Sequence, residues 1–548
     1  MARTPLMRAM QQLASEHAEA AERGISVEEV RQQRRIGISR RQLLKGAGAL
    51  AAGIALADPL GLTGKMLRAE ARTAPRIAII GAGIAGLNAA LTLHDAGYAS
   101  TVYEASSSVG GRMHSNTTTW ANDQTSEWCG ELIDTAHTSI LALAQRFGLK
   151  AVDIRAAEPE GSQNTNFFFG KYYLQSQVDK DFQPVFQVLQ SQNQAAPTTT
   201  YNNFNAAGEK LDHTSLYNWI EQFVPGGHSS NMGQLLDVAY NIEFGRETKE
   251  QSSLNLVYLL GAQPTTGGFE IFGSSDERFH IMGGNQQVPQ AIADFLPDGA
   301  IKFRWRMTAI EKTSSDGIKV IFSTLDGTQQ QNFDRVILTL PFSVLRTLDY
   351  SEAGFTSLKK TAITQLGYGT NAKLQLQFDT RFWNRTGPWP GISTGNIYTD
   401  VGFQNTWDVT RGQAGATGII VDYTGGEVGA AFHPAAPYTT SADPKTRDYA
   451  QTFLHQLEKV WPGISSHYIG KATLSSPTLD PNLRGSYSCW LVGQYTSFAG
   501  YEGVRQGNIH FAGEHCSLNF QGFMEGGAEE GARAAQEILN DYKKNIFP

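Results

Sequence analysis

The chain has 548 residues, 41% of them apolar, which is enough for a large core and for two or three domains. Its net charge of -7 and pI near 6.0, with no basic stripe, argue against a nucleic-acid partner. Only three cysteines occur, Cys129, Cys489 and Cys516, and they have neither disulfide nor metal-ligand spacing, so we predict no metal site.

The first 71 residues differ from the rest and are predicted to be an export leader. A twin-arginine pattern begins at Ser39, and an Ala/Gly/Leu run covers residues 46–62. Asp58 and Pro59 interrupt that run, so it is a poor membrane span. We expect twin-arginine export to the periplasm or the medium, without stable membrane insertion. An amphipathic N-terminal helix with an incidental arginine pair is the alternative.

A dinucleotide-binding unit is predicted next. The apolar run 77–80 indicates a buried strand, and a G-x-G-x-x-G motif follows it and opens a helix that should stop at Gly97. These glycines permit a tight turn, the approach of backbone to a pyrophosphate, and close packing of helix on strand. A second strand, 100–103, delivers Glu104 to the expected place of a ribose hydroxyl. A purely structural glycine turn is the alternative. The residues predicted to line the dinucleotide are Gly81, Ala82, Gly83, Ile84, Ala85, Gly86, Glu104 and Ala105.

The continuation of this unit distinguishes flavin from nicotinamide. The run Gly110-Gly111-Arg112 resembles the second motif of the flavin amine oxidases. The resemblance implies that Gly111 and Arg112 lie along the FAD pyrophosphate, which the arginine neutralises. Residues 127–134 resemble the segment that passes the flavin ring in the same family. The backbone of that segment would contact flavin at Gly130, Glu131 and Leu132.

The middle of the chain is predicted to form a substrate cavity. A helix should begin at Thr138, and a mainly helical insertion lies within 138–250. Trp219 of this insertion is either a substrate wall or a core residue. Residues 276–295 then predict a strand, a Gly-Gly turn and a helix. An antiparallel, alternating pattern over 301–307, 318–322 and 335–339 follows. The resemblance to the amine oxidases implies that the backbone at Met307, near the end of the first of these strands, meets the adenine.

Lys373 is the candidate catalytic residue. Lys373, Gln375 and Gln377 share one face of a predicted strand, which by pattern alone is typical of a solvated edge. The position resembles that of the lysine that holds a water against flavin N5 in amine oxidases, where it serves proton transfer.

Two segments near the C-terminus complete the predicted site. Tyr487 matches one aromatic wall of the amine oxidase substrate cage, and Trp490 is a second wall or a core residue. Ser486 stands where monoamine oxidases carry the cysteine that tethers FAD, so we expect noncovalent FAD. The second flavin signature ends at Glu514, and a helix from about Met524 to Tyr542 should direct its N-terminus at the flavin. The resemblance implies that the flavin is bound by Gly513, Glu514, Gly522, Phe523 and Met524. It also makes Phe523 the second aromatic wall of the substrate cage.

Residues 72–545 thus resemble the flavin-containing amine oxidases. The resemblance implies an α/β protein with a doubly wound, Rossmann-like FAD domain and a mixed-sheet α+β substrate domain. We expect the FAD domain to comprise 72–135, 276–345 and 500–548, and the substrate domain 160–275 and 346–499.

The implied activity is FAD-dependent oxidation of an L-amino acid by dioxygen, giving the 2-oxo acid, ammonia and hydrogen peroxide. A primary amine or polyamine oxidase is the alternative, because Ile133 stands where well-known amino acid oxidases carry a carboxylate-binding arginine. A desaturase-like enzyme or a flavin-binding protein without turnover is a further alternative. The sequence carries no signal for the oligomeric state.

Overall fold

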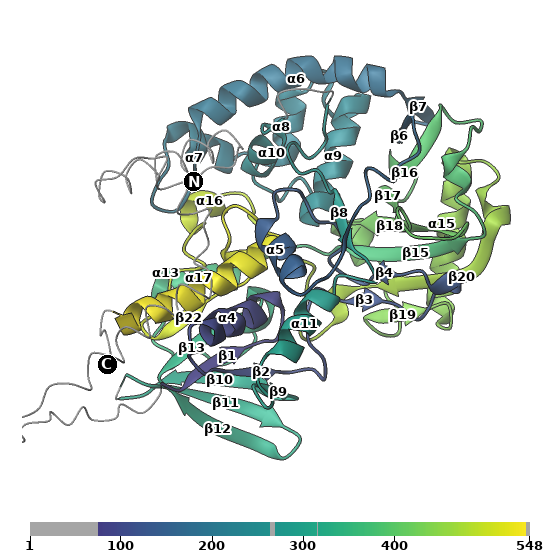
Figure 1. Ribbon diagram of the computed structural model, residues 1–548. Helices are drawn as coiled ribbons and strands as arrows, with labels where there is room; N and C mark the ends of the chain where they lie inside the picture. The colour runs from purple at the N-terminus through teal and green to yellow at the C-terminus, as the bar shows by residue number, and fades with distance from the viewer. Residues whose placement is uncertain (1–74, 264–268, 315, 544–548) are drawn as a thin grey trace, which may run out of the picture. The chain divides into compact units, whose positions relative to one another are not determined.

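A five-stranded parallel sheet carries the first glycine motif (Figure 1). The computed structural model describes residues 75–263, 269–314 and 316–543, so the predicted leader lies outside the described residues. The strand order is β22-β13-β1-β2-β9, and every pair is parallel. The strands are β1 (Ile77–Ile80), β2 (Thr101–Glu104), β9 (Ile301–Phe303), β13 (Arg335–Leu338) and β22 (Ile509–Phe511).

The alternation of side chains along β1 and β2 builds three layers. Ile77 and Ile79 face a cluster formed with helices α4 (Ile84–Asp95) and α17 (Met524–Lys543). Ile80 and Tyr103 face the opposite way, where Tyr103 stacks on Phe322 with ring centroids 4.5 Å apart. Phe322 belongs to a three-stranded antiparallel sheet of β10 (Arg306–Lys312), β11 (Ile318–Thr324) and β12 (Gly327–Phe333). The parallel sheet is therefore buried on both faces, as its apolar strands require.

The predicted strand over 301–307 is wrong in its extent. Arg304 has a φ of 61°, a left-handed conformation that breaks the strand. The chain before it joins the parallel sheet as β9, and the chain after it starts β10. The strand at 335–338 likewise pairs in parallel between β1 and β22 and does not continue the antiparallel pattern. All four of its residues are buried, which suits a central strand.

Helices α4 and α17 pack at very close range. A Cβ atom at Gly531 would lie 2.1 Å from the carbonyl oxygen of Ala85, so only glycine fits there. The Asn88 side chain donates to the Ala528 carbonyl across the same interface, at 2.7 Å. Glu525 of α17 accepts from the amides of Ser139 and Ile140 and so caps helix α5 (Thr138–Arg146).

An eight-stranded mixed sheet forms the second large layer, in the order β19-β20-β15-β18-β17-β16-β6-β7. Helix α15 (Pro444–Val460) packs on it through one apolar cluster. Only the β16–β6 pair of this sheet is parallel. The strands are β6 (Ser162–Phe168), β7 (Lys171–Tyr173), β15 (Ala372–Phe378), β16 (Ile392–Thr399), β17 (Asn405–Asp408), β18 (Gly418–Thr424), β19 (Tyr438–Thr440) and β20 (Tyr468–Ser475).

The helices between β7 and β8 (Phe279–Ile281) gather in one region of Figure 1. They are α6 (Gln175–Ala195), α7 (Ala206–Asp212), α8 (Leu216–Phe223), α9 (Asn231–Phe244) and α10 (Leu254–Leu260). Their inward faces join one large apolar cluster. The division into FAD and substrate domains stays a prediction. Among the described residues, no helix is both long and apolar enough to cross a membrane.

Short elements connect these layers. The strands among them are β3 (Ser115–Asn116), β4 (Ser126–Glu127), β5 (Ala151–Asp153), β8 (Phe279–Ile281), β14 (Gly367–Tyr368) and β21 (Ser488–Cys489). The helices among them are α11 (Gln287–Phe295), α12 (Phe342–Leu345), α13 (Ser357–Gln365), α14 (Gly426–Ala430) and α16 (Gln494–Ser497). The predicted strand, Gly-Gly turn and helix over 276–295 are confirmed as β8, Gly283-Gly284 with positive φ, and α11.

Candidate active site

The turn from β1 into α4 has the geometry of a phosphate-binding loop. Gly81 has a φ of 108°, and a Cβ atom at Gly86 would lie 2.0 Å from the Gly81 carbonyl oxygen. Gly83 is the N-cap residue of α4, and no side chain caps this end of the helix. The first amides of α4 are therefore available to an anion, where the helix dipole also favours negative charge.

Two glycine segments touch beside this turn and leave a cradle of bare backbone. The Gly110 amide donates to the Ala82 carbonyl at 2.9 Å. A Cβ atom at Gly111 would lie 3.5 Å from the Cα atom of Gly83, so a side chain there would fill the gap between the two segments. A cradle of this kind fits the pyrophosphate of a dinucleotide.

Glu104 lies at the end of β2, against the same turn. One carboxylate oxygen accepts from the Ala82 amide at 2.8 Å, and the other accepts from the Ser106 amide at 2.7 Å. Each carboxylate oxygen has a second lone pair, so Glu104 can still accept from a ribose hydroxyl. The half-buried Ala105 follows it directly.

Arg112 of the Gly110-Gly111-Arg112 run pairs with Glu514 of the last predicted flavin motif. The Arg112 guanidinium donates to Glu514 at 2.7 Å and to the Ser486 carbonyl at 3.1 Å. Glu514 also accepts from the Ser488 hydroxyl and from the Gly522 amide, at 2.7 and 2.8 Å. Burial works to raise the pKa of Glu514, but Arg112, His515 and the Ser488 hydroxyl outweigh it, so the pKa is lowered. The predicted contact of Arg112 with a pyrophosphate stays a prediction.

Lys373 is buried in the interior and does not lie on a solvated edge. Strand β15 runs between β20 and β18, and Lys373 is only 6% exposed. Its ammonium donates at 2.8 Å to the Cys129 carbonyl and at 2.8 Å to the Glu131 carboxylate. The polar face shared with Gln375 is therefore directed at the 127–131 segment, because Gln375 donates to the Glu127 carbonyl.

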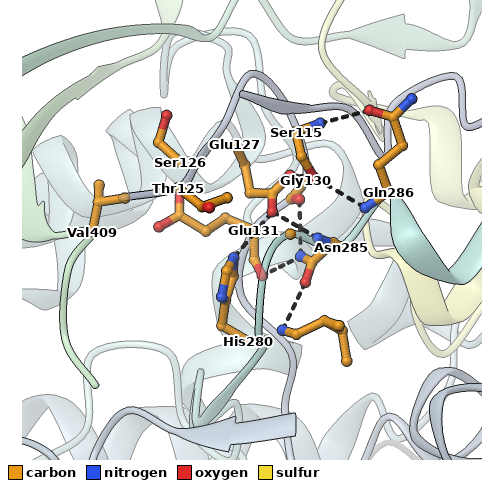
Figure 2. Close-up of polar contacts among 12 residues, drawn as sticks. Ser115, Thr125, Ser126, Glu127, Gly130, Glu131, His280, Asn285, Gln286 and Val409 are labelled. Carbon is orange, nitrogen blue, oxygen red and sulfur yellow. Dashed lines mark hydrogen bonds and ion pairs between the residues drawn. The ribbon is translucent and has the colours of Figure 1, made fainter. Parts of the chain in front are cut away.

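A buried polar network fixes the 127–131 segment from its other side (Figure 2). Glu127 is fully buried and accepts from Ser115, from the Asn285 amide and from His280. The Asn285 side chain donates to the carbonyls of Gly130 and Glu131, at 3.1 and 2.6 Å. Burial works to lower the pKa of His280, but the hydrogen bond and charge of Glu127 outweigh it and raise the pKa.

Tyr487 belongs to a group of aromatic side chains with Tyr423 and Trp407. Its hydroxyl is 2.8 Å from that of Tyr423 and donates to the Ile242 carbonyl at 2.8 Å. Tyr423 in turn contacts Trp407, with ring centroids 5.1 Å apart. A Cβ atom at Gly522 would lie 3.5 Å from the Tyr487 ring, so the segment that carries Phe523 passes close to Tyr487.

Phe523 is half-buried, and its ring lies 5.1 Å from that of His137. Met524 begins α17 and lies against Gly130, where a Cβ atom would meet its sulfur at 3.1 Å. Leu132 is half-buried against the cluster that contains Trp407. Gly513 precedes Glu514 with a φ of 132°.

The other predicted site residues lie in the apolar core. Trp219 is fully buried in α8, and its indole donates to Gln192 at 2.7 Å. Trp490 is 2% exposed, and its indole donates to Glu502 at 2.8 Å. Met307 is 3% exposed in β10. Both tryptophans are thus buried with their indole N–H groups bonded to other side chains, as is typical of core residues.

Sequence reasoning missed several residues that shape the site. Glu131 was predicted to act through its backbone, yet its side chain binds Lys373. Trp407, Tyr423 and Asn285 were not predicted at all. Asn285 directly follows the Gly-Gly turn, which was a usable signal, whereas nothing local in the sequence marks Trp407.

Comparison with known proteins identifies the family and the leader. Residues 84–539 match the family described as flavin containing amine oxidoreductase, and residues 37–57 match the twin-arginine translocation signal, which indicates export by that route. An L-amino acid dehydrogenase of Synechocystis is 24% identical over 497 residues, which cover 84% of this chain and 94% of the relative. The L-amino-acid oxidase of Mus musculus is 24% identical over 487 residues, which cover 85% and 71%. The solved structure of cyclohexylamine oxidase from Brevibacterium oxydans superposes with a TM-score of 0.71 at 20% identity, covering 86% of this chain and 100% of that chain.

Proposed function

The chain belongs to the flavin-containing amine oxidoreductases, and we propose that it is an exported, FAD-dependent L-amino-acid oxidase. The observation that carries this proposal is the contact of Lys373 with the 129–131 segment, in which Lys373 and Glu131 are separated by 242 positions in the chain. The same segment bonds to Arg112, the partner of Glu514. The L-amino acid specificity is supported by the relatives from Synechocystis and mouse.

The residues of the chain fit FAD, and different segments would bind its different parts. The N-terminus of α4 receives the pyrophosphate, and Glu104 receives the ribose. The 129–131 segment and the N-terminus of α17 would hold the ring system. When bound, FAD would supply the acceptor for a hydride from the carbon that bears the unprotonated amine, and dioxygen would reoxidise it to give hydrogen peroxide. The imine product then reacts with water to give the 2-oxo acid and ammonia.

The remaining work of the protein is positioning. Tyr487 and Phe523 flank the amine, and Lys373 directs a hydrogen-bond donor at a water near the reacting carbon. Water access and the orientation of the amine are thus set by three side chains from three separate segments.

Noncovalent binding of FAD is supported by the surroundings of Ser486. Its hydroxyl donates to the Asn371 side chain at 2.7 Å. The nearby Cys489 is fully buried, and burial raises the pKa of its thiol to about 12, so it is not a thiolate that would form a thioether.

A primary amine or polyamine oxidase is the second candidate, and two observations favour it. Ile133 is fully buried in the apolar cluster of α4 and α17, so it offers nothing to a carboxylate. Glu243 and Glu277 are half-buried, and desolvation and, next in order, the charges of other carboxylates raise their pKa values, that of Glu277 to about 8. Glu243 follows Ile242, whose carbonyl binds Tyr487, so this acidic region adjoins the cage. A cationic amine would restore the charged form of both groups.

A substrate panel tests the choice. Purified holoenzyme is offered L-amino acids beside the amines that they give on decarboxylation, and peroxide release is measured with dioxygen, or dye reduction with an artificial acceptor. Faster turnover of the amino acids supports the proposal, and faster turnover of the amines replaces it with the second candidate. Dye reduction without peroxide indicates a dehydrogenase. Heat denaturation must release the yellow cofactor into the supernatant, whereas colour retained in the pellet contradicts noncovalent binding.

A further inference from the structure

Glu131 makes two side-chain contacts that the backbone role predicted for it does not explain. One carboxylate oxygen lies 2.8 Å from the Lys373 ammonium, and the other accepts from the Trp407 indole at 2.8 Å. Glu131, Lys373 and Trp407 are 7%, 6% and 8% exposed, so all three groups have left water. The carboxylate is thus held at both oxygens, and its orientation is fixed.

The backbone around Glu131 is fixed as well. Asn285 binds the carbonyls of Gly130 and Glu131, as Figure 2 shows. A Cβ atom at Gly130 would lie 3.1 Å from the Arg112 carbonyl oxygen and 3.1 Å from the Met524 sulfur, so the segment has little room to move. Side chain and main chain therefore present one rigid acceptor to Lys373.

The geometry leaves Lys373 one direction in which to act. An ammonium has three donors, and within the described ranges two of them go to Cys129 and Glu131. The ammonium also lies 5.3 Å from the centre of the Trp407 ring. Trp407 contacts Tyr423, which contacts Tyr487, so the cluster continues into the aromatic group.

A buried ion pair contributes little to the stability of a fold, because the cost of removing two charges from water offsets their attraction. Its presence beside the predicted flavin ring calls for another explanation. We propose that Glu131 is the positioning residue for Lys373: its carboxylate, oriented by Trp407, directs the third donor of the ammonium at the reaction site. This inference rests on the proposed function, because it assigns a partner to the lysine of that same site.

A double-mutant cycle tests the proposal. In the Glu131→Gln variant we expect the anaerobic reduction of bound flavin by the best substrate of the panel to slow at least tenfold. Lys373→Met should slow it at least as much. The double variant should be within twofold of Lys373→Met, because the two residues act as one unit. Effects that multiply, or a Glu131→Gln rate within twofold of the wild type, overturn the proposal.

A readout without turnover separates this inference from the proposed function. Glu131→Gln and Lys373→Met should change the visible absorption of the bound flavin in the same way. A changed spectrum in Lys373→Met beside a wild-type spectrum in Glu131→Gln overturns the inference even where no panel compound is oxidised. A wild-type enzyme that is yellow but oxidises nothing contradicts the proposed function alone.

Two further variants complete the design. Glu502→Gln is the matched control, because Glu502 is buried and accepts from an indole, that of Trp490, without touching Lys373. It should keep the wild-type rate and spectrum. If Glu131→Gln does not fold, Trp407→Phe keeps both charges and releases only one carboxylate oxygen. It should slow flavin reduction severalfold, and an unchanged rate in this variant overturns the proposal.

Discussion

The guanidinium of Arg112 and the carboxylate of Glu514 meet at 2.7 Å across 402 residues of sequence. The contact ties the segment after the first glycine motif to the segment before α17. Because Glu514 also binds Ser488 and Gly522, a single carboxylate organises three parts of the predicted flavin site.

Glu514→Gln should therefore weaken both the fold and cofactor binding. Removing one partner of a buried pair leaves the other charge uncompensated, which costs about 3 kcal/mol in the free energy of unfolding. Urea denaturation and the dissociation constant of FAD measure the two effects. Asp95→Asn is the control, because it removes an exposed ion pair with Arg146 and should cost less than about 1 kcal/mol.

The same pair predicts a pH dependence. The pKa of Glu514 is lowered from an ordinary value of 4.5, so its contribution to stability is present above pH 4.5 and is lost as pH falls through the folded-state pKa. The stability difference between wild type and Glu514→Gln should be constant near neutrality and shrink in acid. A difference that grows below pH 4.5 would contradict this.

The Glu127–His280 pair should show the opposite sign. The pKa of His280 is raised above 6.5, so its contribution is full below pH 6.5 and is lost as pH rises through the folded-state pKa. His280→Gln keeps a donor for Glu127 but cannot be protonated. The melting temperatures of wild type and variant should differ most near pH 5.5 to 6 and converge in alkali. Scanning calorimetry at a series of pH values from acid to alkali measures both.

Gly531→Ala should disrupt the contact between α17 and α4. The added methyl would lie 2.1 Å from the Ala85 carbonyl oxygen, so the helices must separate, at a cost of about 2 kcal/mol. Thermal unfolding measures the loss. Asn540→Ala, at an exposed position of the same helix, should leave the melting temperature within a degree or two; equal effects of the two variants would show that the contact is not close.

Trp219→Phe separates a core role from a substrate role. The indole donates to Gln192 in a fully buried site, so the variant should lose about 1 to 2 kcal/mol of stability and keep the wild-type KM and kcat. A KM raised several-fold at unchanged stability would instead support the role of Trp219 as a wall of the substrate cavity.

Local patterns in the sequence predicted the elements correctly where few residues decide the backbone. The strand, glycine turn and helix of β1 and α4, the acid at the end of β2, and the helix from Met524 all follow from spacing and glycine placement. Each depends on contacts within about 20 residues, which the hydrophobic period and the glycines determine. The prediction of one strand at 301–307 was wrong, because the sheet that a short apolar strand joins is chosen by its neighbours.

The sequence by itself determined the family resemblance, the leader and the choice of Lys373 as the candidate catalytic residue. Only the tertiary structure decided that Lys373 is buried, that Glu131 and Trp407 hold it, and that Trp219 lies in the core. The physical reason is distance along the chain: Glu131 and Trp407 lie 276 residues apart, and hydrogen bonds of that span depend on the packing of whole layers. No local period records such a pairing.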